Sequence, residues 1–271
     1  MIQAVDRAVR ILMVLQGARR MSLGEIAAEL ELAPSTVHGI IRTLLGHGMV
    51  AQERDSGRYR LGPATLRLGN VYLHTLELRS RVVGWAEDLA RRTGCAVRAG
   101  VLLQGDVVVV HHEPSPDGSR QMPEVGIVIP AHACALGKVL LAGGGTEIGT
   151  ELGTELGTEL GSGLGNRPLR SMTADTVTDP ARLRAELEVV RRTGIATEAE
   201  EAVIGECGIA APLVDASGEV PGALGLVVPA SRWPLDAAAT EAVRTAARSI
   251  SRELGASTWP PAVRELPAAS A

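Results

Sequence analysis

Four residues on one side of a predicted helix have side chains suited to contacting nucleic acid. They are Ser35, His38, Gly39 and Arg42, within the stretch APSTVHGIIRTLLGHGMV (33–50). The i, i+3, i+4, i+7 spacing places them on one helix face, while valines, isoleucines and leucines form an apolar face on another side. Hydroxyl, imidazole and guanidinium groups can bond phosphates and base edges, and glycine permits a close backbone approach. This face suits DNA, although a polar face can also simply be solvated.

The segments around this helix are those of a winged helix-turn-helix. Residues 4–17 have the apolar periodicity of a helix, and Ser22 with Glu25 three positions later forms a capping box that begins a short second helix. Pro34 fits the first turn of the third helix. Two short strand-like runs then flank the turn sequence DSG at 55–57. In this fold the third helix enters the major groove, so its polar face would meet DNA.

The charge distribution agrees with DNA contact at one end of the chain. Residues 1–62 carry a net charge of +2, whereas the remainder carries −6. A winged module can also contact protein instead of DNA, and that function is the alternative. The predicted DNA-contacting residues are polar or basic, with one glycine: Ser22, Ser35, Thr36, His38, Gly39, Arg42, Thr43, Arg54, Arg58 and Arg60.

Beyond residue 62 the sequence predicts a linker and a second domain. Residues 63–81 have helical periodicity, with a break expected near Arg81. Residues 82–254 alternate strand-like and helical segments in an order that gives an α+β domain with an antiparallel sheet. Residues 143–165 contain a four-residue Gly-Thr-Glu-Leu repeat, which we interpret as a low-complexity loop rather than a partner site. The Pro- and Ala-rich residues 255–271 are expected to be disordered.

Several classes of function find no support in the sequence. Cys95, Cys134 and Cys207 lack zinc spacing, so no metal or other cofactor is expected. Nucleophilic catalysis needs a base oriented toward the nucleophile. No such base is recognisable near Cys207 or near the consecutive histidines His111 and His112, so we do not expect an enzyme. No apolar run is long enough to span a membrane and the N-terminus lacks a signal-peptide layout, which predicts a cytoplasmic protein without a membrane partner.

Taken together, four stretches carry a resemblance to a known family. APSTVHGIIRTLLGHGMV, GRYRLGP, IPAHACALGKVLLA and GIATEAEEAVIGECGIAAPLVDASGEV resemble the IclR family of bacterial transcriptional regulators, over residues 3–254. Within it, GVLLQGDVVVVHHEPSPDGSRQ is most similar to the glycerol operon regulators of actinomycetes. The resemblance implies a GAF-like effector-binding domain and dimers that pair into tetramers. It also implies that the protein binds or releases double-stranded operator DNA in response to a small metabolite. A repressor of glycerol catabolism is the expected function, and a regulator sensing an aromatic or small organic acid is the alternative.

The resemblance also implies an effector site. Members that sense small carboxylates use positions that correspond here to Glu198, Gly208, Gly225 and Val227. Three of these lack a polar side chain, which argues against a glyoxylate- or pyruvate-like ligand.

Glycerol 3-phosphate, which the glycerol regulators suggest, needs cations or backbone N–H groups for its phosphate. His111 and His112 are adjacent on a strand, so at most one of them faces the site. The predicted effector-binding residues come from the strands, the helix at 135 and the segment before it: His111, Arg120, Ala135, Leu136, Gly137, Glu198, Cys207, Gly208, Gly225 and Val227.

Overall fold

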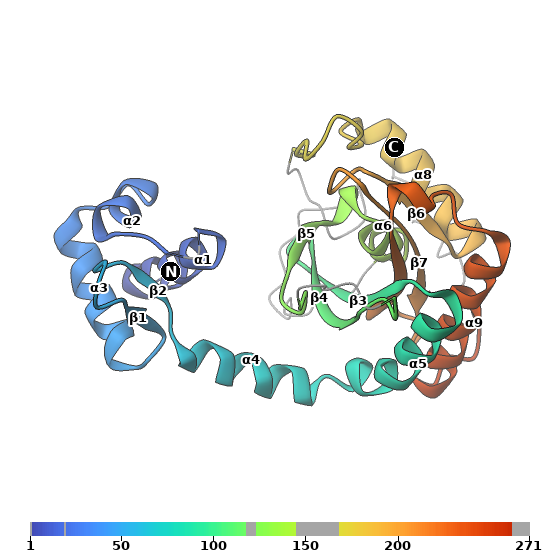
Figure 1. The fold of residues 1–271 in the computed structure, drawn as a ribbon, viewed down its shortest axis with the longest axis horizontal. Helices are drawn as coiled ribbons and strands as arrows, with labels where there is room; N and C mark the ends of the chain where they lie inside the picture. The colour runs from blue at the N-terminus through green and yellow to red at the C-terminus, as the bar shows by residue number, and fades with distance from the viewer. Residues whose placement is uncertain (1, 19, 118–122, 145–167, 262–271) are drawn as a thin grey trace, which may run out of the picture. The chain divides into compact units, whose positions relative to one another are not determined.

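The computed structural model describes residues 2–18, 20–117, 123–144 and 168–261 (Figure 1). Its contacts divide the chain into two units, Met1–Leu76 and Glu77–Ala271. The α+β class expected from the sequence is confirmed, with a helix-turn-helix and small hairpin in the first unit and a six-stranded antiparallel sheet in the second.

The first unit is built as the sequence predicts. Its elements are α1 (Gln3–Ala18), α2 (Leu23–Glu29), α3 (Pro34–Gly46), β1 (Val50–Gln52), β2 (Tyr59–Leu61) and α4 (Pro63–Thr75). The capping box at the start of α2 is present, because the Ser22 Oγ accepts from the Glu25 N–H and the Glu25 carboxylate accepts from the Ser22 N–H. Ile11, Ile26 and Val37, one from each helix, are fully buried and hold the three helices together.

The helix break after α4 lies five residues earlier than expected. α4 ends at Thr75, Leu76 is extended, and α5 (Glu77–Thr93) follows. Leu78 and Val82 of α5 are buried, so the residues from 77 onward belong to the packing of the second unit. The predicted linker helix 63–81 is therefore α4 plus the first turn of α5.

The second unit is organised around one curled sheet. Its elements after α5 are β3 (Ala96–Leu103), β4 (Asp106–Glu113), β5 (Val128–Pro130), η1 (Ala131–Ala133), α6 (Ala135–Ala142), α8 (Pro180–Thr193), β6 (Ala196–Ala199), β7 (Glu206–Leu213), β8 (Gly222–Pro229), η2 (Ala230–Arg232) and α9 (Ala237–Glu253). The strand order is β5-β4-β3-β8-β7-β6, and every neighbouring pair is antiparallel. Strand β6 is short and was not anticipated.

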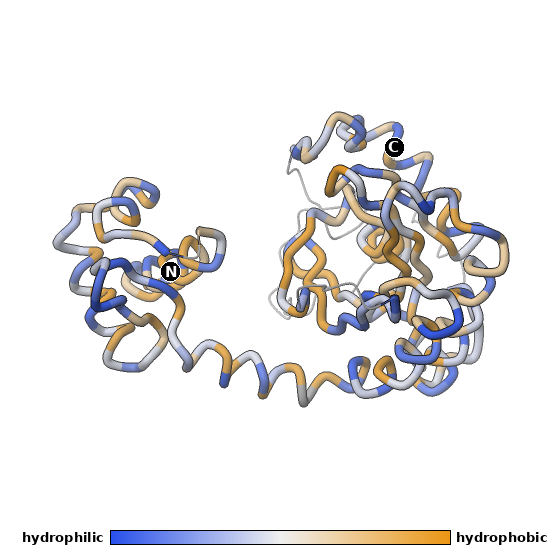
Figure 2. Tube along the Cα trace, viewed as in Figure 1, coloured by the Kyte–Doolittle hydropathy of each residue, from blue (hydrophilic) through white to orange (hydrophobic). Residues whose placement is uncertain are grey.

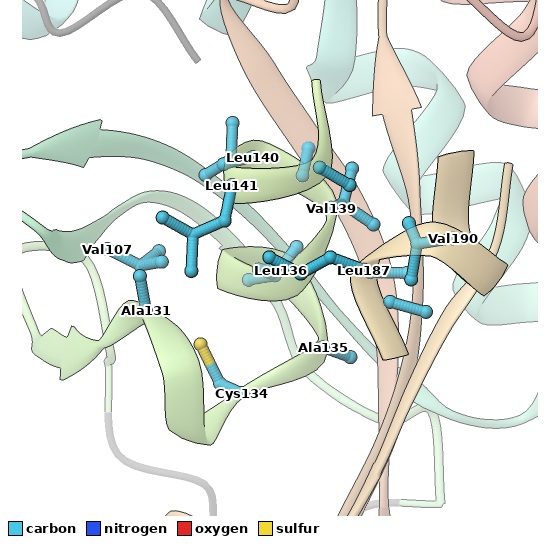
Figure 3. Packing of buried hydrophobic residues seen from close by; sticks show 14 of the residues in the cluster. Val107, Ala131, Cys134, Ala135, Leu136, Val139, Leu140, Leu141, Leu187 and Val190 are labelled. Atoms are coloured by element: carbon cyan, nitrogen blue, oxygen red, sulfur yellow. The ribbon is translucent and has the colours of Figure 1, made fainter. Parts of the chain in front are cut away.

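Helices cover both faces of this sheet. α6 and α8 pack on one face, while α5 and α9 pack together on the other (Figure 1). All eight residues of α6 are buried, and the strands and α6 are the most hydrophobic part of the unit (Figure 2). On the α6 face, Leu136 and Val139 lie next to Leu187 and Val190 of α8 (Figure 3). This face, which we call the α6 face, also holds the polar residues considered below.

The chain after α9 remains attached to the second unit as far as residue 261. The Trp259 Nε1 donates a hydrogen bond to the Pro212 carbonyl at 2.9 Å, and the Arg248 guanidinium lies 5.3 Å from the centre of the Trp259 ring. The disorder expected from 255 onward therefore does not apply to 255–261. Residues 262–271 and the repeat at 145–165 lie outside the described residues. No helix in the described ranges combines the length and apolar character needed to cross a membrane.

Candidate functional site

The polar face of α3 is open to solvent. Ser35, His38, Gly39 and Arg42 are all exposed, whereas Val37 on the opposite face is fully buried. Thr43 is also exposed and its hydroxyl donates to the Gly39 carbonyl at 3.3 Å; Thr36 is half-buried.

The beginning of α3 has no side-chain cap. Pro34, which has no N–H, stands in the first turn, and Ala33, the N-cap residue, supplies no side-chain hydrogen bond. The N–H groups of Thr36 and Val37 both donate to the Ala33 carbonyl, at 2.9 Å and 3.2 Å. The positive end of the helix dipole at a helix N-terminus favours phosphate. The N-terminal end of α3 and its polar face can therefore receive a DNA backbone and base edges.

Besides Thr43, two of the predicted DNA-contacting residues have side-chain partners within the protein. Ser22 is held in the capping box, and the Arg58 Nη2 donates to the Glu25 Oε1 at 3.0 Å. The Ser22 backbone N–H is the largest cause that lowers the pKa of Glu25. Arg58 thus ties the hairpin to the start of α2, while Arg54 and Arg60 are exposed.

In the second unit, the strand register brings together four of the predicted effector residues. Glu198 pairs with Gly208, Gly208 with Val227, and Gly225 with Arg98. Paired residues in a sheet project to the same side. The Glu198, Gly208, Gly225 and Val227 positions therefore share the α6 face with Arg98.

His111 and Cys207 lie on the other side of the sheet. His111 pairs with Ala99 and Cys207 with Ala199, one position out of step with the α6 face. Burial, and then the nearby Arg79 of α5, lower the pKa of His111. A β-bulge between Ala99 and Gly100 sets this register, which the sequence does not reveal.

The other histidine of the pair is the one on the α6 face. His112 pairs with Arg98, and its Nε2 lies 3.6 Å from a carboxylate oxygen of Glu124. The prediction that at most one of the two histidines faces the site agrees with this arrangement, but the choice of His111 does not.

Arg98 is the central charged residue of the α6 face, and it was not among the predicted site residues. It is 9% exposed, and its guanidinium donates to both Glu124 and Glu206, with Nη2 at 2.9 Å and 3.1 Å from their oxygens. Burial acts to lower its pKa, but the two carboxylates outweigh burial and raise it. An arginine within the apolar run AVRAGVLL was the available signal for a buried charge.

A second polar cluster lies on the same face. The Lys138 Nζ donates to Glu186 at 2.7 Å and to Glu201 at 2.6 Å, and Lys138 is only 1% exposed. Burial, the largest cause, raises the pKa of the neighbouring Glu198 to about 8, although the Glu201 N–H donates to it at 3.2 Å. At neutral pH the Glu198 carboxyl is therefore mostly protonated and can donate a hydrogen bond.

Two of the three glycines of the predicted effector site, Gly137 and Gly225, are explained by close packing. A Cβ on Gly137 would lie 2.1 Å from the Ala131 carbonyl oxygen, and one on Gly225 would lie 2.4 Å from the Ile209 carbonyl oxygen. Both positions require glycine for the fold itself. Ala135 and Leu136 are buried in the first turn of α6, with Leu136 in the core (Figure 3).

Arg120 lies outside the described residues. No cluster of three or more metal-ligating side chains occurs in the part of the chain that the structure describes.

Comparison with known proteins places both units in one family. Residues 4–54 match the IclR helix-turn-helix domain, and residues 70–252 match the bacterial transcriptional regulator IclR C-terminal domain. The chain is 40% identical over 260 residues to the glycerol operon regulatory protein of Streptomyces coelicolor, covering 94% of this chain and 97% of that protein. It is 42% identical, with the same coverage, to the glycerol operon regulatory protein of Streptomyces griseus.

Solved structures agree with this assignment. An IclR homologue from Microbacterium hydrocarbonoxydans, solved with 4-hydroxybenzoate, matches with a TM-score of 0.73 and 25% identity, over 93% of this chain and 99% of that one. An IclR regulator from Silicibacter matches with a TM-score of 0.75 and 25% identity, over 95% and 98% of the two chains. The family consists of transcriptional regulators rather than enzymes. The protein belongs to the IclR family and is a DNA-binding regulator with a C-terminal effector-binding domain.

Proposed function

We propose that this protein represses a glycerol catabolic operon and is released from its operator by glycerol 3-phosphate. The similarity to two glycerol operon regulatory proteins over 94% of the chain is the observation that carries this proposal. Both the operator and the chromosome are in the cytoplasm, where we place the protein.

The exposed face of α3 supports operator recognition by the first unit. Arg42 is exposed there beside Ser35 and His38, and its guanidinium has the geometry to bond guanine in two places. Because Ser22 and Arg58 have partners within the protein, we assign them to fixing α2 and the hairpin, and leave the wing contacts to Arg54 and Arg60.

Binding to an operator with two half-sites requires two copies of the DNA-binding unit, and we propose a homodimer whose dimers pair into tetramers. Three exposed apolar residues of α1 and one just before it follow helical spacing, and we call them the α1 stripe: Ile2, Val5, Val9 and Met13. α4 exposes a further apolar set: Leu66, Leu68, Val71 and Tyr72. Exposed apolar surface of this extent on a small unit is typical of a protein contact.

The effector would act by changing how the two DNA-binding units are spaced. A ligand shifts DNA affinity only by the difference in its affinity for the two states. We propose that the ligand bound on the α6 face alters the direction of the linker at residues 63–81. Coupling between such sites is typically about 1–3 kcal/mol, or roughly 5- to 150-fold in operator affinity.

Two measurements on the full-length protein test this function. In gel-shift titrations Arg42→Ala should weaken operator binding by about 1–3 kcal/mol and relax specificity at one base pair. Arg184→Ala, an exposed arginine of α8, is the matched control and should bind normally. Unchanged binding by Arg42→Ala would remove the α3 face from recognition.

The second measurement concerns the effector. Glycerol 3-phosphate should dissociate the protein–operator complex, whereas 4-hydroxybenzoate should not. If only the aromatic acid dissociates it, the protein is an IclR regulator of another catabolic operon. We choose 4-hydroxybenzoate as the alternative effector because a solved IclR homologue was crystallised with it.

A further inference from the structure

The α6 face holds more negative than positive charge around Arg98. One guanidinium is shared by the carboxylates of Glu124 and Glu206, and each carboxylate accepts two of its N–H groups. Arg98 is 9% exposed, and the side chains of Glu124 and Glu206 are 19% and 26% exposed. One carboxylate is enough to neutralise Arg98. Removing a second carboxylate from water costs free energy that this neutralisation does not require.

The two carboxylates differ in how they are held. Glu206 lies on β7, in register with Pro229 of β8. Glu124 comes from a stretch outside the sheet, in which Pro123, Val125 and Gly126 are exposed. Glu124 is thus the half-buried residue of an otherwise exposed stretch, with its side chain directed inward to Arg98.

The imidazole of His112, next to Glu124, has a buried nitrogen with no hydrogen bond to any described residue. The Nε2 of His112 is buried and has no hydrogen-bond partner among the residues that the structure describes, and it lies 3.6 Å from a Glu124 oxygen. Buried polar atoms nearly always have a partner, so an orphaned one indicates an incomplete site. Burial, the largest cause, lowers the pKa of His112, so the ring is mostly neutral at pH 7 and its Nε2 can serve as a donor or an acceptor according to the tautomer.

We propose that Glu124 occupies an anion position built into the protein, and that the acidic group of the effector, a phosphate monoester or a carboxylate, displaces the Glu124 carboxylate from Arg98 and bonds His112. This rests on the proposed function of the domain and defines the class of its effector. Glu206 stays on Arg98, and the displaced Glu124 side chain turns to solvent. The exchange replaces one anion by another, so the charge of the buried cluster is preserved for a singly charged group.

The proposal makes a specific distinction between anionic and neutral ligands. A neutral polyol would bond carboxylates through its hydroxyls, so it would gain from Glu124 or be indifferent to it. An anion competes with Glu124, so removal of that charge should strengthen anion binding. Removing the Glu124 charge should therefore raise the affinity for an anionic ligand, and should lower or not change the affinity for a neutral polyol.

The experiment is calorimetry on the full-length protein and Glu124→Gln, with inorganic phosphate, glycerol 3-phosphate and glycerol as probes. Glu124→Gln should bind phosphate and glycerol 3-phosphate roughly 10- to 100-fold more tightly, the range expected for a charged hydrogen-bonding competitor. Glycerol should gain nothing. Glu87→Gln, which removes an exposed carboxylate from α5 on the opposite face, is the matched control and should leave all three affinities unchanged.

A double variant assigns the gain to Arg98. Arg98→Gln with Glu124→Gln removes one positive and one negative charge together and should lose the tighter anion binding, while circular dichroism verifies its fold. Should the double variant not fold, Glu124→Gln alone decides through the anion–glycerol contrast.

The calorimetry and the operator-release measurement together separate a failure of the anion position from a failure of the proposed effector. No gain for either anion in Glu124→Gln overturns this inference, even where glycerol 3-phosphate releases the operator from the wild type. Tighter phosphate binding by Glu124→Gln, together with no operator response to glycerol 3-phosphate, supports the anion position and overturns the proposed effector. Stronger glycerol binding in the wild type than in Glu124→Gln would assign the site to neutral polyols.

Discussion

At the scale of single residues, Glu198 is the group whose proton affinity changes most on folding among the carboxyls described. Burial raises its pKa from 4.5 to about 8, and the neighbouring carboxylates of Glu201 and Glu206 add to the rise. Between these two pH values the folded state holds a proton that the unfolded state releases. The free energy of unfolding should therefore fall as the pH rises through this window.

The substitution Glu198→Gln isolates this contribution, because glutamine stays neutral at every pH. The wild type should lose stability relative to Glu198→Gln from about pH 4.5 to pH 8, by up to about 1.4 kcal/mol per pH unit. Urea unfolding at several pH values measures the difference. Glu87→Gln, an exposed carboxyl, should show no such trend, and parallel curves for wild type and Glu198→Gln would contradict a raised pKa.

Arg42 and Arg98 differ in how well their surroundings could be predicted from the sequence. Helical periodicity was enough to place Arg42 on the exposed face of α3, since neighbours on a helix are close in sequence. Arg98 pairs with Glu124 and Glu206, which are 26 and 108 residues away. Only the tertiary fold brings such residues together, so helical or strand periodicity could not find them. The face of His112 likewise depends on a bulge that local sequence does not specify.

At the scale of elements, Lys138 joins three segments on the α6 face. It lies on α6, and its two carboxylate partners are Glu186 on α8 and Glu201 after β6. It is the single lysine of the sequence and is 1% exposed. Removing one partner of a buried ion pair leaves an uncompensated charge in a poorly solvated position.

Lys138→Met should therefore lower the free energy of unfolding by about 3–5 kcal/mol. Adding Glu201→Gln should recover part of this loss, since the carboxylate left alone is then neutral. Arg182→Ala removes an exposed arginine that pairs with the same Glu186 at 3.3 Å, and its cost should be at most about 1 kcal/mol. Chemical unfolding compares the variants, and equal costs for the two cations would show that burial does not matter here.

Elements differed in how well the sequence specified them. Helices with local signals were predicted closely, such as α2 with its capping box and α3 with Pro34. β6 has only four residues, ATEA, with little apolar content, so it was missed. The break at Leu76 was misplaced because apolar periodicity continues past it, and the burial of Leu78 in the second unit decides where α5 begins.

At the scale of the assembled protein, an operator with two half-sites requires two copies to present their α3 helices at a fixed distance. The α1 stripe and the exposed apolar residues of α4 belong to the same unit as α3. Contact through that unit would fix the distance between two α3 helices, which half-site spacing requires. Two linked half-site contacts also raise affinity by about 100- to 10,000-fold over one.

Val9→Glu, which puts a charge in the middle of the α1 stripe, should therefore separate the DNA-binding units. Operator affinity should fall by about 100-fold or more, because each unit then binds its half-site alone. Ala4→Glu adds the same charge at an exposed position on the opposite side of α1 and should bind as the wild type does. Gel-shift titration measures the affinity, and analytical ultracentrifugation of isolated residues 1–76, an independently packed unit, measures association. Association and operator binding that both survive Val9→Glu would exclude the α1 stripe and leave α4 as the candidate contact. Loss of operator binding with association intact would mean that Val9→Glu disturbs the α3 face itself, which the Ala4→Glu control and circular dichroism would distinguish from a loss of fold.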